Sequence, residues 1–572
     1  MPSQRRPIYL NPAPTTASGV PSASASVQAF HESFPGYAAS PLVALPTIAH
    51  ELGVRAVYVK QESDRFGLPA FKVLGASWAI YRAVTTALGQ PSDTPLVALV
   101  NGIRTGAAAG AALTLIAATE GNHGRAVARV AQQMGLRCRI YVPHTMHEYT
   151  RQMIRSEGAD LEVVDGDYDR AVQTAATAAT AAPAAPEGAP NILIQDTAFA
   201  GYEEIPGWIV EGYSTLLREA DAQLHAVGLQ STLVVAPVGV GSFAHAVAAS
   251  SKSRESPAAV VTVEPDTAAT LTTSLRRGVP TSVATSPSIM AGMNCGTVST
   301  TAWPQLHQLV DASVTVSDWE SHCAVQQLAA QSVDSGPCGA ASLAAIRRLK
   351  AEHDTERFFA PDSVILLLST EGPRPYAVPV DVSPDDPVEL TQVLTRINSS
   401  NPTLSQSEGA GETAIVNYLS ACLTTYEGDA LSGHQGMKDG EEVVFGRGAL
   451  DMKAGLAAGL SALLVAQRTP LSGDVLVAAV ADEEDSSQGD DGWTGPRTPS
   501  NPAARGLGHG RDGACASVPF WCDAALLTAA GIPSIVFGPS GGGLHAKEEW
   551  VTVDNIRAVT GVLGRLIRQF CP

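Results

Sequence analysis

The sequence predicts an α/β protein whose larger part is built on parallel sheets. Between about residue 40 and residue 372, short apolar runs alternate with stretches of helical periodicity, which is typical of such sheets. Residues 373–389 are dense in proline and aspartate and predict a linker. A second α/β region follows the linker, and it is short. The runs that we expect to form strands are 54–61, 136–143, 160–166, 231–239, 258–265 and 362–370.

The length of the chain predicts more than one domain. At 572 residues and 59.2 kDa, it is too long for a single hydrophobic core. The first residues are rich in serine, alanine and proline, which predicts a flexible segment. The parts that we expect are a flexible segment 1–30, an α/β domain 31–372, the linker 373–389 and an incomplete second domain 390–572.

Composition excludes several classes of partner. The net charge of −19 argues against a nucleic acid or an anionic membrane surface as the partner. The eight cysteines are scattered without CxxC pairs, which favours a reducing compartment. The first residues lack the apolar core of a secretory signal, and the longest apolar run, 107–118, is too short to span a bilayer. We therefore expect a cytoplasmic protein.

The stretch "AATEGNHGRAVA", residues 117–128, is the first candidate site. Gly121 and Gly124 allow a sharp turn or a close approach of the backbone to a ligand. The residues that follow have helical periodicity, so the turn presents free backbone N–H groups at a helix start. Asn122 lies in this turn and Glu120 directly precedes it. Taken alone, the stretch is more typical of an ordinary strand-to-helix turn than of a ligand site.

Three further segments carry chemistry that fits the same site. In "AFKVLGASWA", Lys72 lies among apolar residues, where desolvation would lower the pKa of its amine and make it a nucleophile for an aldehyde. In "VVAPVGVGSFAHAVA", a buried strand leads through the loop Gly239–Ser242 into a helix, an arrangement that binds phosphate. The strand "SVILLLSTEG" ends in the hydroxyls of Ser369 and Thr370. Each segment alone also fits a structural role.

Together the four segments describe a site for pyridoxal 5'-phosphate. Their order resembles that of the fold-type II pyridoxal phosphate enzymes, the tryptophan synthase β-like family, in which two open twisted α/β subdomains hold the cofactor between them. The resemblance covers about residues 40–372. It implies Lys72 as the Schiff-base lysine, Asn122 beside the ring hydroxyl, Gly239, Gly241 and Ser242 at the phosphate, and Ser369 at the pyridine nitrogen.

Within that group the motifs are most similar to those of the diaminopropionate ammonia-lyase family. The similar stretches are "ESDRFGLPAFKVLGASWA", "TEGNHGRAVA", "IQDTAFAGYEEIPGWIVEGYSTLLREA" and "IMAGMNCG". The resemblance implies α,β-elimination of 2,3-diaminopropionate to pyruvate and ammonia, with a homodimer as the usual assembly. It also implies Asp196 as a substrate-site carboxylate and Glu120 as a second base, where the family has aspartate. Asp196 also fits a cap of a helix or turn.

The region after the linker contains the stretches "FGRGALDMKAGLAAGLSALL", "VLVAAVADEED" and "GIPSIVFGPSGGGLHAKEEWVTVD". These stretches resemble those of the zinc-dependent acetylornithine deacetylase and succinyl-diaminopimelate desuccinylase family. The resemblance implies Asp451 as a bridging ligand, Glu483 as general base, and Glu484 and His545 as metal ligands. The early HxD motif of the family is absent, because His434 is followed two positions later by Gly436. A second acidic ligand and the lid domain, at 485–513, are missing too. We therefore expect a vestigial site, with zinc or cobalt as a cofactor only if this region functions.

Alternatives from other classes stay open. The chain could be bifunctional, with a metal-dependent amidohydrolase acting on N-acyl amino acids, or it could be a lyase similar to serine and threonine dehydratases. It could also be a non-catalytic protein that binds amino acids on a lyase fold. Lys72 argues against the last alternative, because a protein without catalysis has no need of an amine for the aldehyde.

Overall fold

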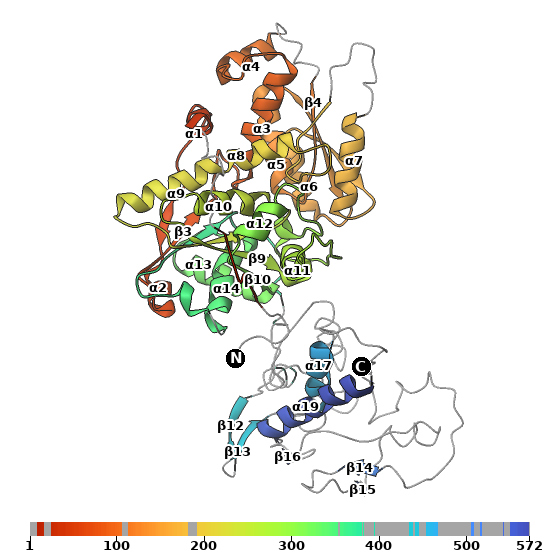
Figure 1. The fold of residues 1–572 in the computed structure, drawn as a ribbon. Helices are drawn as coiled ribbons and strands as arrows, with labels where there is room; N and C mark the ends of the chain where they lie inside the picture. Colours follow the sequence, from red (N-terminus) through yellow and green to blue (C-terminus); the bar gives the residue numbers. More distant parts are fainter. Residues whose placement is uncertain are drawn as a thin grey trace, which may run out of the picture. The chain divides into compact units, whose positions relative to one another are not determined.

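The computed structural model describes the chain in two compact units, and the division between them falls after Pro379, within the predicted linker. Beyond residue 380 it describes separate short stretches, drawn in colour in Figure 1. Before that point it describes residues 8–15, 25–105, 113–180, 191–352 and 355–379.

The larger sheet of the first unit has seven strands and a parallel centre. The two edge strands run antiparallel to their neighbours, and every residue of the central strand β11 is buried. Burial on both faces explains its unbroken apolar run VILLLS. In spatial order the strands are β1 (Tyr9–Leu10), β10 (Ala312–Val316), β9 (Ala259–Pro265), β8 (Leu233–Pro237), β11 (Val364–Ser369), β3 (Ala56–Gln61) and β2 (Leu42–Ala44).

The smaller sheet is entirely parallel. In spatial order its strands are β6 (Asp160–Val164), β5 (Arg137–Pro143), β4 (Thr114–Ala118) and β7 (Asn191–Leu193). All six runs expected to be strands are present, as β3, β5, β6, β8, β9 and β11, and the predicted α/β class is confirmed. The short strands β1, β2, β4, β7 and β10 were not among the predicted runs, because two to five residues carry too little periodicity.

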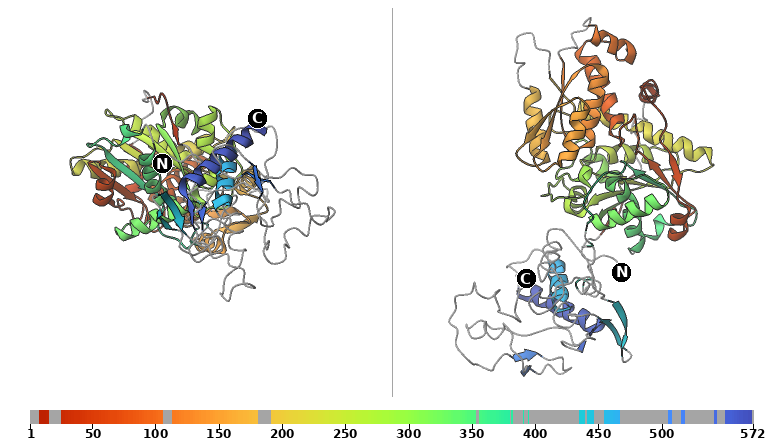
Figure 2. Two further views of the ribbon diagram at one scale, coloured as in Figure 1. Left: turned by 90° about the horizontal axis from the view of Figure 1, so that it is seen from below. Right: turned by 180° about the vertical axis from the view of Figure 1, so that it is seen from behind.

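Helices cover these sheets (Figures 1 and 2). Helices α5 and α7 pack against the smaller sheet, whereas α10 and α14 pack against the larger one. The helices of the first unit are α1 (Ala25–Glu32), α2 (Pro46–Leu52), α3 (Lys72–Ala87), α4 (Leu96–Arg104), α5 (Asn122–Met134), α6 (Glu148–Ser156), α7 (Tyr168–Thr180), α8 (Glu204–Gly212), α9 (Ser214–Ala226), α10 (Ser242–Lys252), α11 (Thr270–Arg277), α12 (Trp303–Leu309), α13 (Asp318–Ala330) and α14 (Pro337–Ala351).

Each sheet has a point at which the direction of its connections reverses, and both points bring candidate residues together. In the smaller sheet, β4 is flanked by β5 on one side and by the later strand β7 on the other. In the larger sheet, β8 is flanked in the same way by β9 and β11. Ligands of open α/β sheets bind at the carboxyl ends of strands at such points. The fold therefore predicts a site near the carboxyl ends of β4 and β7 in the smaller sheet and of β8 and β11 in the larger one.

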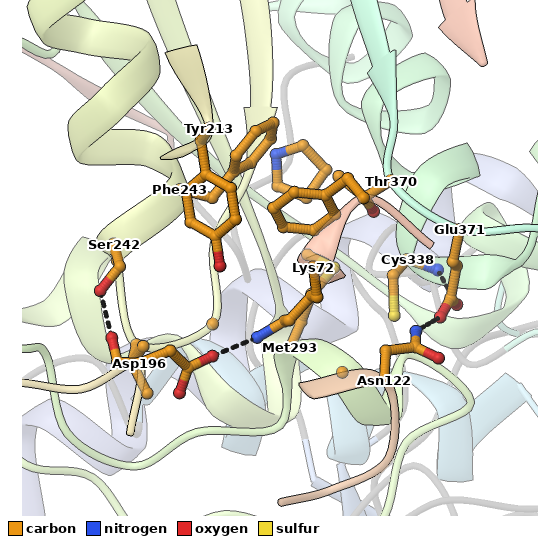
Figure 3. Close-up of a pocket in the computed structure, with 16 residues that line it drawn as sticks. Lys72, Asn122, Asp196, Tyr213, Ser242, Phe243, Met293, Cys338, Thr370 and Glu371 are labelled. Atoms are coloured by element: carbon orange, nitrogen blue, oxygen red, sulfur yellow. Dashed lines mark hydrogen bonds and ion pairs between the residues drawn. The ribbon is translucent and has the colours of Figure 1, made fainter. Parts of the chain in front are cut away.

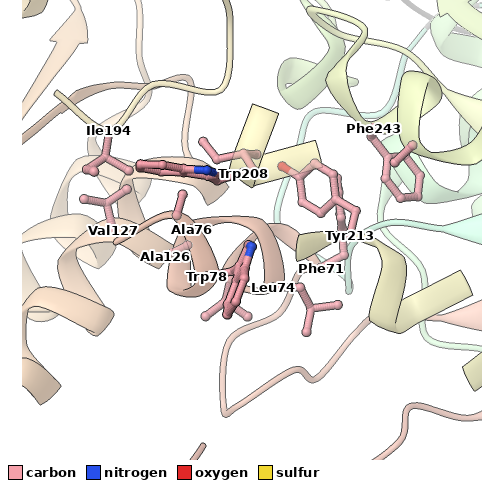
Figure 4. Packing of buried hydrophobic residues seen from close by; sticks show 14 of the residues in the cluster. Phe71, Leu74, Ala76, Trp78, Ala126, Val127, Ile194, Trp208, Tyr213 and Phe243 are labelled. Atoms are coloured by element: carbon pink, nitrogen blue, oxygen red, sulfur yellow. The ribbon is translucent and has the colours of Figure 1, made fainter. Parts of the chain in front are cut away.

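Close packing in the core holds the start of α3 in place. Helices α3 and α8 touch at Gly75 and Gly212, where a Cβ on Gly212 would lie 2.6 Å from the carbonyl oxygen of Leu74. Figure 4 shows the aromatic residues around this contact, with Tyr213 beside Phe71. Because Lys72 is the first residue of α3, this packing fixes the backbone that carries it.

The second unit is described in part. A four-stranded antiparallel sheet has the order β12 (His434–Lys438), β13 (Glu441–Phe445), β17 (Trp550–Thr552) and β16 (Gly541–Gly542). Its remaining elements are α17 (Ala454–Ala466), α19 (Val553–Phe570) and the pair β14 (Arg505–Leu507) and β15 (Cys515–Ser517). Helices α17 and α19 pack together. Of the helices described in either unit, none is both long and apolar enough to cross a membrane.

Candidate active site

A cavity lies where the strands β7, β8 and β11 and the first turns of α3, α5 and α10 meet (Figure 3). It brings together most of the residues that the sequence predicted for the cofactor site. Those that line it are Lys72, Asn122, Asp196, Gly239, Gly241 and Ser242. Its aromatic wall consists of Phe71, Tyr213 and Phe243, with the rings of Phe71 and Phe243 4.3 Å apart between centroids.

Lys72 and Asp196 form an ion pair at the centre of the cavity. The Nζ of Lys72 donates to Oδ2 of Asp196 at 2.5 Å. Asp196 follows β7, and its side chain is 3% exposed. The phenol of Tyr168 approaches the other carboxylate oxygen at 3.3 Å, and Nδ1 of His123 lies 3.9 Å from Oδ2. Asp196 is therefore a buried side-chain carboxylate in the cavity and not a cap of a helix or turn.

The charge state of Lys72 differs from the sequence prediction. Burial acts to lower its pKa, as predicted, but the adjacent Asp196 carboxylate outweighs burial and raises the pKa above its ordinary value. For Asp196, burial acts to raise the pKa, yet the Lys72 ammonium lowers it to about 2. Both groups are charged at neutral pH. The expectation that desolvation lowers the pKa of Lys72 was therefore wrong for this state, because no local pattern connects Lys72 with Asp196.

Glu120 lines a second cavity, whose lining also includes Lys72, Tyr168 and Asp196. Burial raises the pKa of Glu120 to about 7; the Arg374 guanidinium acts to lower it, and Asp167 adds to the rise. A carboxyl group that titrates near neutral pH is suited to proton transfer at that pH. The structure thus brings the three predicted catalytic residues, Lys72, Glu120 and Asp196, to one site.

The glycine loop before α10 forms a cradle at the end of β8. Gly241 has a φ of +96°, a conformation that favours glycine, and precedes the first helical residue, Ser242. A Cβ on Gly239 would lie 3.0 Å from the carbonyl oxygen of Gly292. The Ser242 hydroxyl donates to the backbone oxygen of Asp196, which ties the loop to the Lys72 partner. The first N–H groups of the helix have no partner within it, so they are available to an anion.

Asn122 is held by a carboxylate that the sequence analysis did not identify. Its Nδ2 donates to Oε2 of Glu371 at 2.8 Å, and the other oxygen of Glu371 accepts from the backbone N–H of Cys338 at 3.2 Å (Figure 3). Glu371 is 3% exposed and follows the central strand β11. The rule that ligands bind at the carboxyl ends of central strands would have singled it out.

Ser369, predicted at the pyridine nitrogen, does not line either cavity. Its hydroxyl donates to Oγ of Ser335 at 2.8 Å. Thr370, the next residue, does line the cavity. Because side chains of a strand alternate between its two faces, neighbouring hydroxyls point in different directions. The contact of Ser369 with the ring stays a prediction.

The residues present fit pyridoxal phosphate. The half-buried amine of Lys72 lines the cavity, where it could react with an aldehyde after losing its proton; the glycine cradle suits a phosphate, and aromatic rings line the same cavity. Asn122 and Asp196 follow strands of the smaller sheet and the cradle follows β8 of the larger sheet, so the cofactor would lie between the two sheets. Fold and site define a pyridoxal phosphate enzyme of fold type II.

Comparisons with known proteins agree with this class. The model of the family described as pyridoxal-phosphate dependent enzyme matches residues 34–370. The diaminopropionate ammonia-lyase of Salmonella typhimurium is 33% identical over 376 residues, which cover 63% of this chain and 89% of that protein. The Escherichia coli enzyme of the same name is 33% identical over 357 residues, which cover 60% and 86%.

Solved structures lead to the same group. Crystal structures of the Escherichia coli diaminopropionate ammonia-lyase, in complex with an aminoacrylate-PLP azomethine reaction intermediate and with D-serine, match with TM-scores of 0.55 and 0.56. Their sequence identities are 29% and 30%, and each match covers 64% of this chain and 93% of the solved one. The chain belongs to the pyridoxal-phosphate dependent enzyme family, in the branch of the diaminopropionate ammonia-lyases. The resemblance inferred from its motifs is confirmed.

The predicted hydrolase region also has a family match. The model of peptidase family M20/M25/M40 matches residues 427–497, which contain Asp451, Glu483 and Glu484. His545 lies beyond that match. All four of these residues fall outside the part of the chain that the structure describes. Within the part that is described, the structure contains no cluster of three side chains suited to a metal ion.

Proposed function

We propose that this chain catalyses the pyridoxal-phosphate-dependent α,β-elimination of 2,3-diaminopropionate to pyruvate and ammonia. The observation that supports the proposal is the grouping of Lys72, Asp196 and Glu120 around one cavity that also holds the glycine cradle. The bound cofactor supplies an aldehyde for the substrate amine and a conjugated ring that accepts electrons from Cα. Similarity to the diaminopropionate ammonia-lyases supports this choice of substrate.

Lys72 and Asp196 act as a pair in this proposal. To react with an aldehyde, the Lys72 ammonium must first lose a proton, because only the neutral amine is a nucleophile. Asp196 holds the ammonium at 2.5 Å and so fixes the amine at the place of reaction. Once the Lys72 charge is lost, Asp196 is a buried anion that favours a cation beside it. The cationic β-amino group of diaminopropionate is such a cation.

Glu120 and Lys72 are the two groups placed to accept the proton from Cα. Both line the same cavity; Glu120 has a pKa of about 7, and Lys72 can accept a proton once its own ammonium has been deprotonated. Two bases on opposite faces of Cα would allow both enantiomers to be deprotonated, one by each group. We therefore infer that both D- and L-2,3-diaminopropionate are substrates.

The chemical balance of the reaction needs no other reactant than water. The Cα–H and Cβ–N bonds break, a Cα–Cβ double bond forms, and the β-nitrogen leaves as ammonia. The unsaturated amine that is released takes up water and yields pyruvate and a second ammonia.

The test is a measurement of pyruvate and ammonia formed from each enantiomer by the purified protein loaded with pyridoxal phosphate. We expect two equivalents of ammonia for each pyruvate, with L-serine and L-threonine as poorer substrates. Turnover of L-threonine at a higher kcat/KM than diaminopropionate would contradict the proposal and favour a dehydratase. Loss of all turnover in Lys72→Ala is the matched control.

The remaining parts of the proposal concern the oligomeric state and the cellular compartment. We infer a cytoplasmic homodimer that binds neither nucleic acid nor membranes. The net charge of −19 and the scattered cysteines support this inference. Light scattering on the purified full chain tests the assembly, and a mass of one or four chains would contradict it.

A further inference from the structure

Tyr213 brings a buried phenol to the wall of the candidate active site, and the motif that contains it gave it no role. It joins the end of α8 to the start of α9 and is 1% exposed. Its ring packs against Phe71 and, edge to face, against Phe243, at centroid distances of 4.8 and 5.6 Å. These contacts hold the ring so that its hydroxyl points into the cavity, toward the ion pair at the centre (Figure 3).

The hydroxyl of Tyr213 has no hydrogen-bond partner among the residues that the structure describes. Two other buried tyrosines do have one: the hydroxyl of Tyr168 donates to Asp196 at 3.3 Å, and that of Tyr81 donates to the carbonyl oxygen of Thr94 at 2.7 Å. Burial raises the pKa of Tyr213, so its phenol keeps the proton and is available as a donor. A buried donor without a partner costs free energy that a bound acceptor restores.

The other side-chain donors on this side of the cavity are already engaged. The Lys72 ammonium donates to the carboxylate of Asp196, and the Ser242 hydroxyl donates to the backbone oxygen of Asp196. Thr370 has a hydroxyl too, but Figure 3 shows it on the other side of Lys72 from Ser242. Among the described residues that line this cavity, Lys72 is the one cation, and its amine is needed for the aldehyde. An anion in the glycine cradle would therefore depend on backbone N–H groups and on Tyr213.

We propose that the hydroxyl of Tyr213 donates a hydrogen bond to the phosphate of the bound cofactor, as a side-chain member of the glycine cradle. In pyridoxal phosphate the aldehyde and the arm that bears the phosphate are on neighbouring ring carbons, so the groups that hold them must lie near one another. The hydroxyl of Tyr213 faces the space between Ser242 and Lys72 (Figure 3). A hydrogen bond to a phosphate oxygen is charge-assisted and therefore stronger than one between neutral groups. The proposal concerns the cofactor and does not depend on the identity of the substrate.

Cofactor affinity with and without the phosphate tests this contact. The full chain is freed of cofactor and titrated with pyridoxal phosphate or with pyridoxal, which has the aldehyde but no phosphate. Tyr213→Phe should weaken the binding of pyridoxal phosphate by roughly tenfold or more, the loss of one charge-assisted hydrogen bond. It should leave the binding of pyridoxal unchanged. Unchanged affinity for pyridoxal phosphate, or an equal or greater loss of affinity for pyridoxal, would overturn the proposal.

The matched control is Tyr81→Phe. Tyr81 is also a buried tyrosine, 5% exposed, and lies on α3 as Lys72 does, but it does not line the cavity. Its replacement removes a buried hydroxyl and should leave cofactor affinity unchanged. In phosphorus NMR spectra of the holoenzyme, the resonance of the bound phosphate should shift in Tyr213→Phe and stay in place in Tyr81→Phe. An unmoved resonance in Tyr213→Phe, or equal effects of both variants, would contradict the contact.

Turnover separates this proposal from a contact with the substrate and from the proposed function. At saturating pyridoxal phosphate, Tyr213→Phe should have a KM for diaminopropionate close to that of the unaltered chain. A KM raised tenfold with unchanged cofactor affinity would assign the hydroxyl to the substrate and overturn the proposal. Phosphate affinity that depends on Tyr213, in a chain without lyase activity, would leave the contact standing and refute the proposed reaction. Lyase activity with unchanged cofactor affinity in Tyr213→Phe would do the reverse.

Discussion

Replacement of Glu120 should separate the two enantiomers of diaminopropionate by their dependence on pH. Glu120 has a pKa of about 7, so about a tenth of it is ionised at pH 6 and about nine tenths at pH 8. A base works only when it is deprotonated, so the rate that depends on Glu120 should rise roughly tenfold between these values. The enantiomer deprotonated by Lys72 should lack this limb of the profile.

The assay is initial-rate formation of pyruvate from each enantiomer between about pH 5.5 and about pH 9, a range that brackets the titration of such a base. Glu120→Gln should lower kcat for one enantiomer by about 10²–10⁴-fold and remove its limb near neutral pH. Glu120→Asp should retain most activity, because the carboxyl group remains. Glu148→Gln, at an exposed carboxyl group on α6, is the control. Equal losses on both enantiomers, or an unchanged limb in Glu120→Gln, would refute this reasoning.

Glu120 should also lower the free energy of unfolding at neutral and higher pH, where its carboxyl group is ionised. The pKa of Glu120 is raised in the folded chain from 4.5 to about 7, so the folded state binds the proton more tightly than the unfolded state. Stability is therefore lost as the pH rises from about 4.5 through about 7, by at most about 3 kcal/mol. Glu120→Gln should melt at a higher temperature than the unaltered chain at pH 8 and at a similar one near pH 4.5. An equal difference at both pH values would contradict the linkage.

Three further changes test other parts of the site. Lys72→Ala should abolish the cofactor link that borohydride makes permanent, together with the absorbance near ~410 nm that such a link gives; a permanent link in the variant would contradict the role of Lys72. Asp196→Asn should lower the pKa of Lys72 and weaken turnover by at least about 10²-fold, measured as kcat against pH; wild-type kcat would exclude a role for the carboxylate. Thr370→Val and Ser369→Ala, compared by cofactor affinity, should show which hydroxyl contacts the pyridine ring, and an effect of Thr370→Val alone would overturn the prediction for Ser369. Removal of the residues after 385 should leave pyruvate formation unchanged, and the full chain should release no acetate from N-acetylornithine with added zinc or cobalt; metal-dependent release would make the protein bifunctional.

Local pattern was sufficient for most of the fold and for much of the site. The buried strand β11 and the glycine turn before α10 have signals that lie within about ten residues, and both were predicted with nearly correct bounds. The site residues that the motifs carried, such as Lys72 and Asn122, come to one cavity as expected. These predictions succeeded because glycine, lysine and apolar runs have the same local meaning in any α/β fold.

Residues that act through partners distant in the sequence were harder to predict. The raised pKa of Lys72 depends on Asp196, 124 positions later, and no local pattern connects the two. Glu371 follows the last strand of the domain, within a quoted motif in which only the hydroxyls drew attention. Its role becomes visible only when the structure brings the end of β11 beside the start of α5.

The two points at which the connections of the sheets reverse explain how residues far apart in the sequence come together at this site. The smaller sheet supplies Glu120 and Asn122 after β4 and Asp196 after β7, whereas the larger sheet supplies the glycine cradle after β8 and Thr370 after β11. Each contribution needs only a strand that ends at the right edge, so its distance along the chain has no effect on the geometry. Lys72 is the exception, because it does not directly follow the end of a strand. Its position therefore depends on the close contact of α3 with α8, and a Cβ on Gly75, which would lie 2.7 Å from Tyr213, should displace the one amine that the reaction requires.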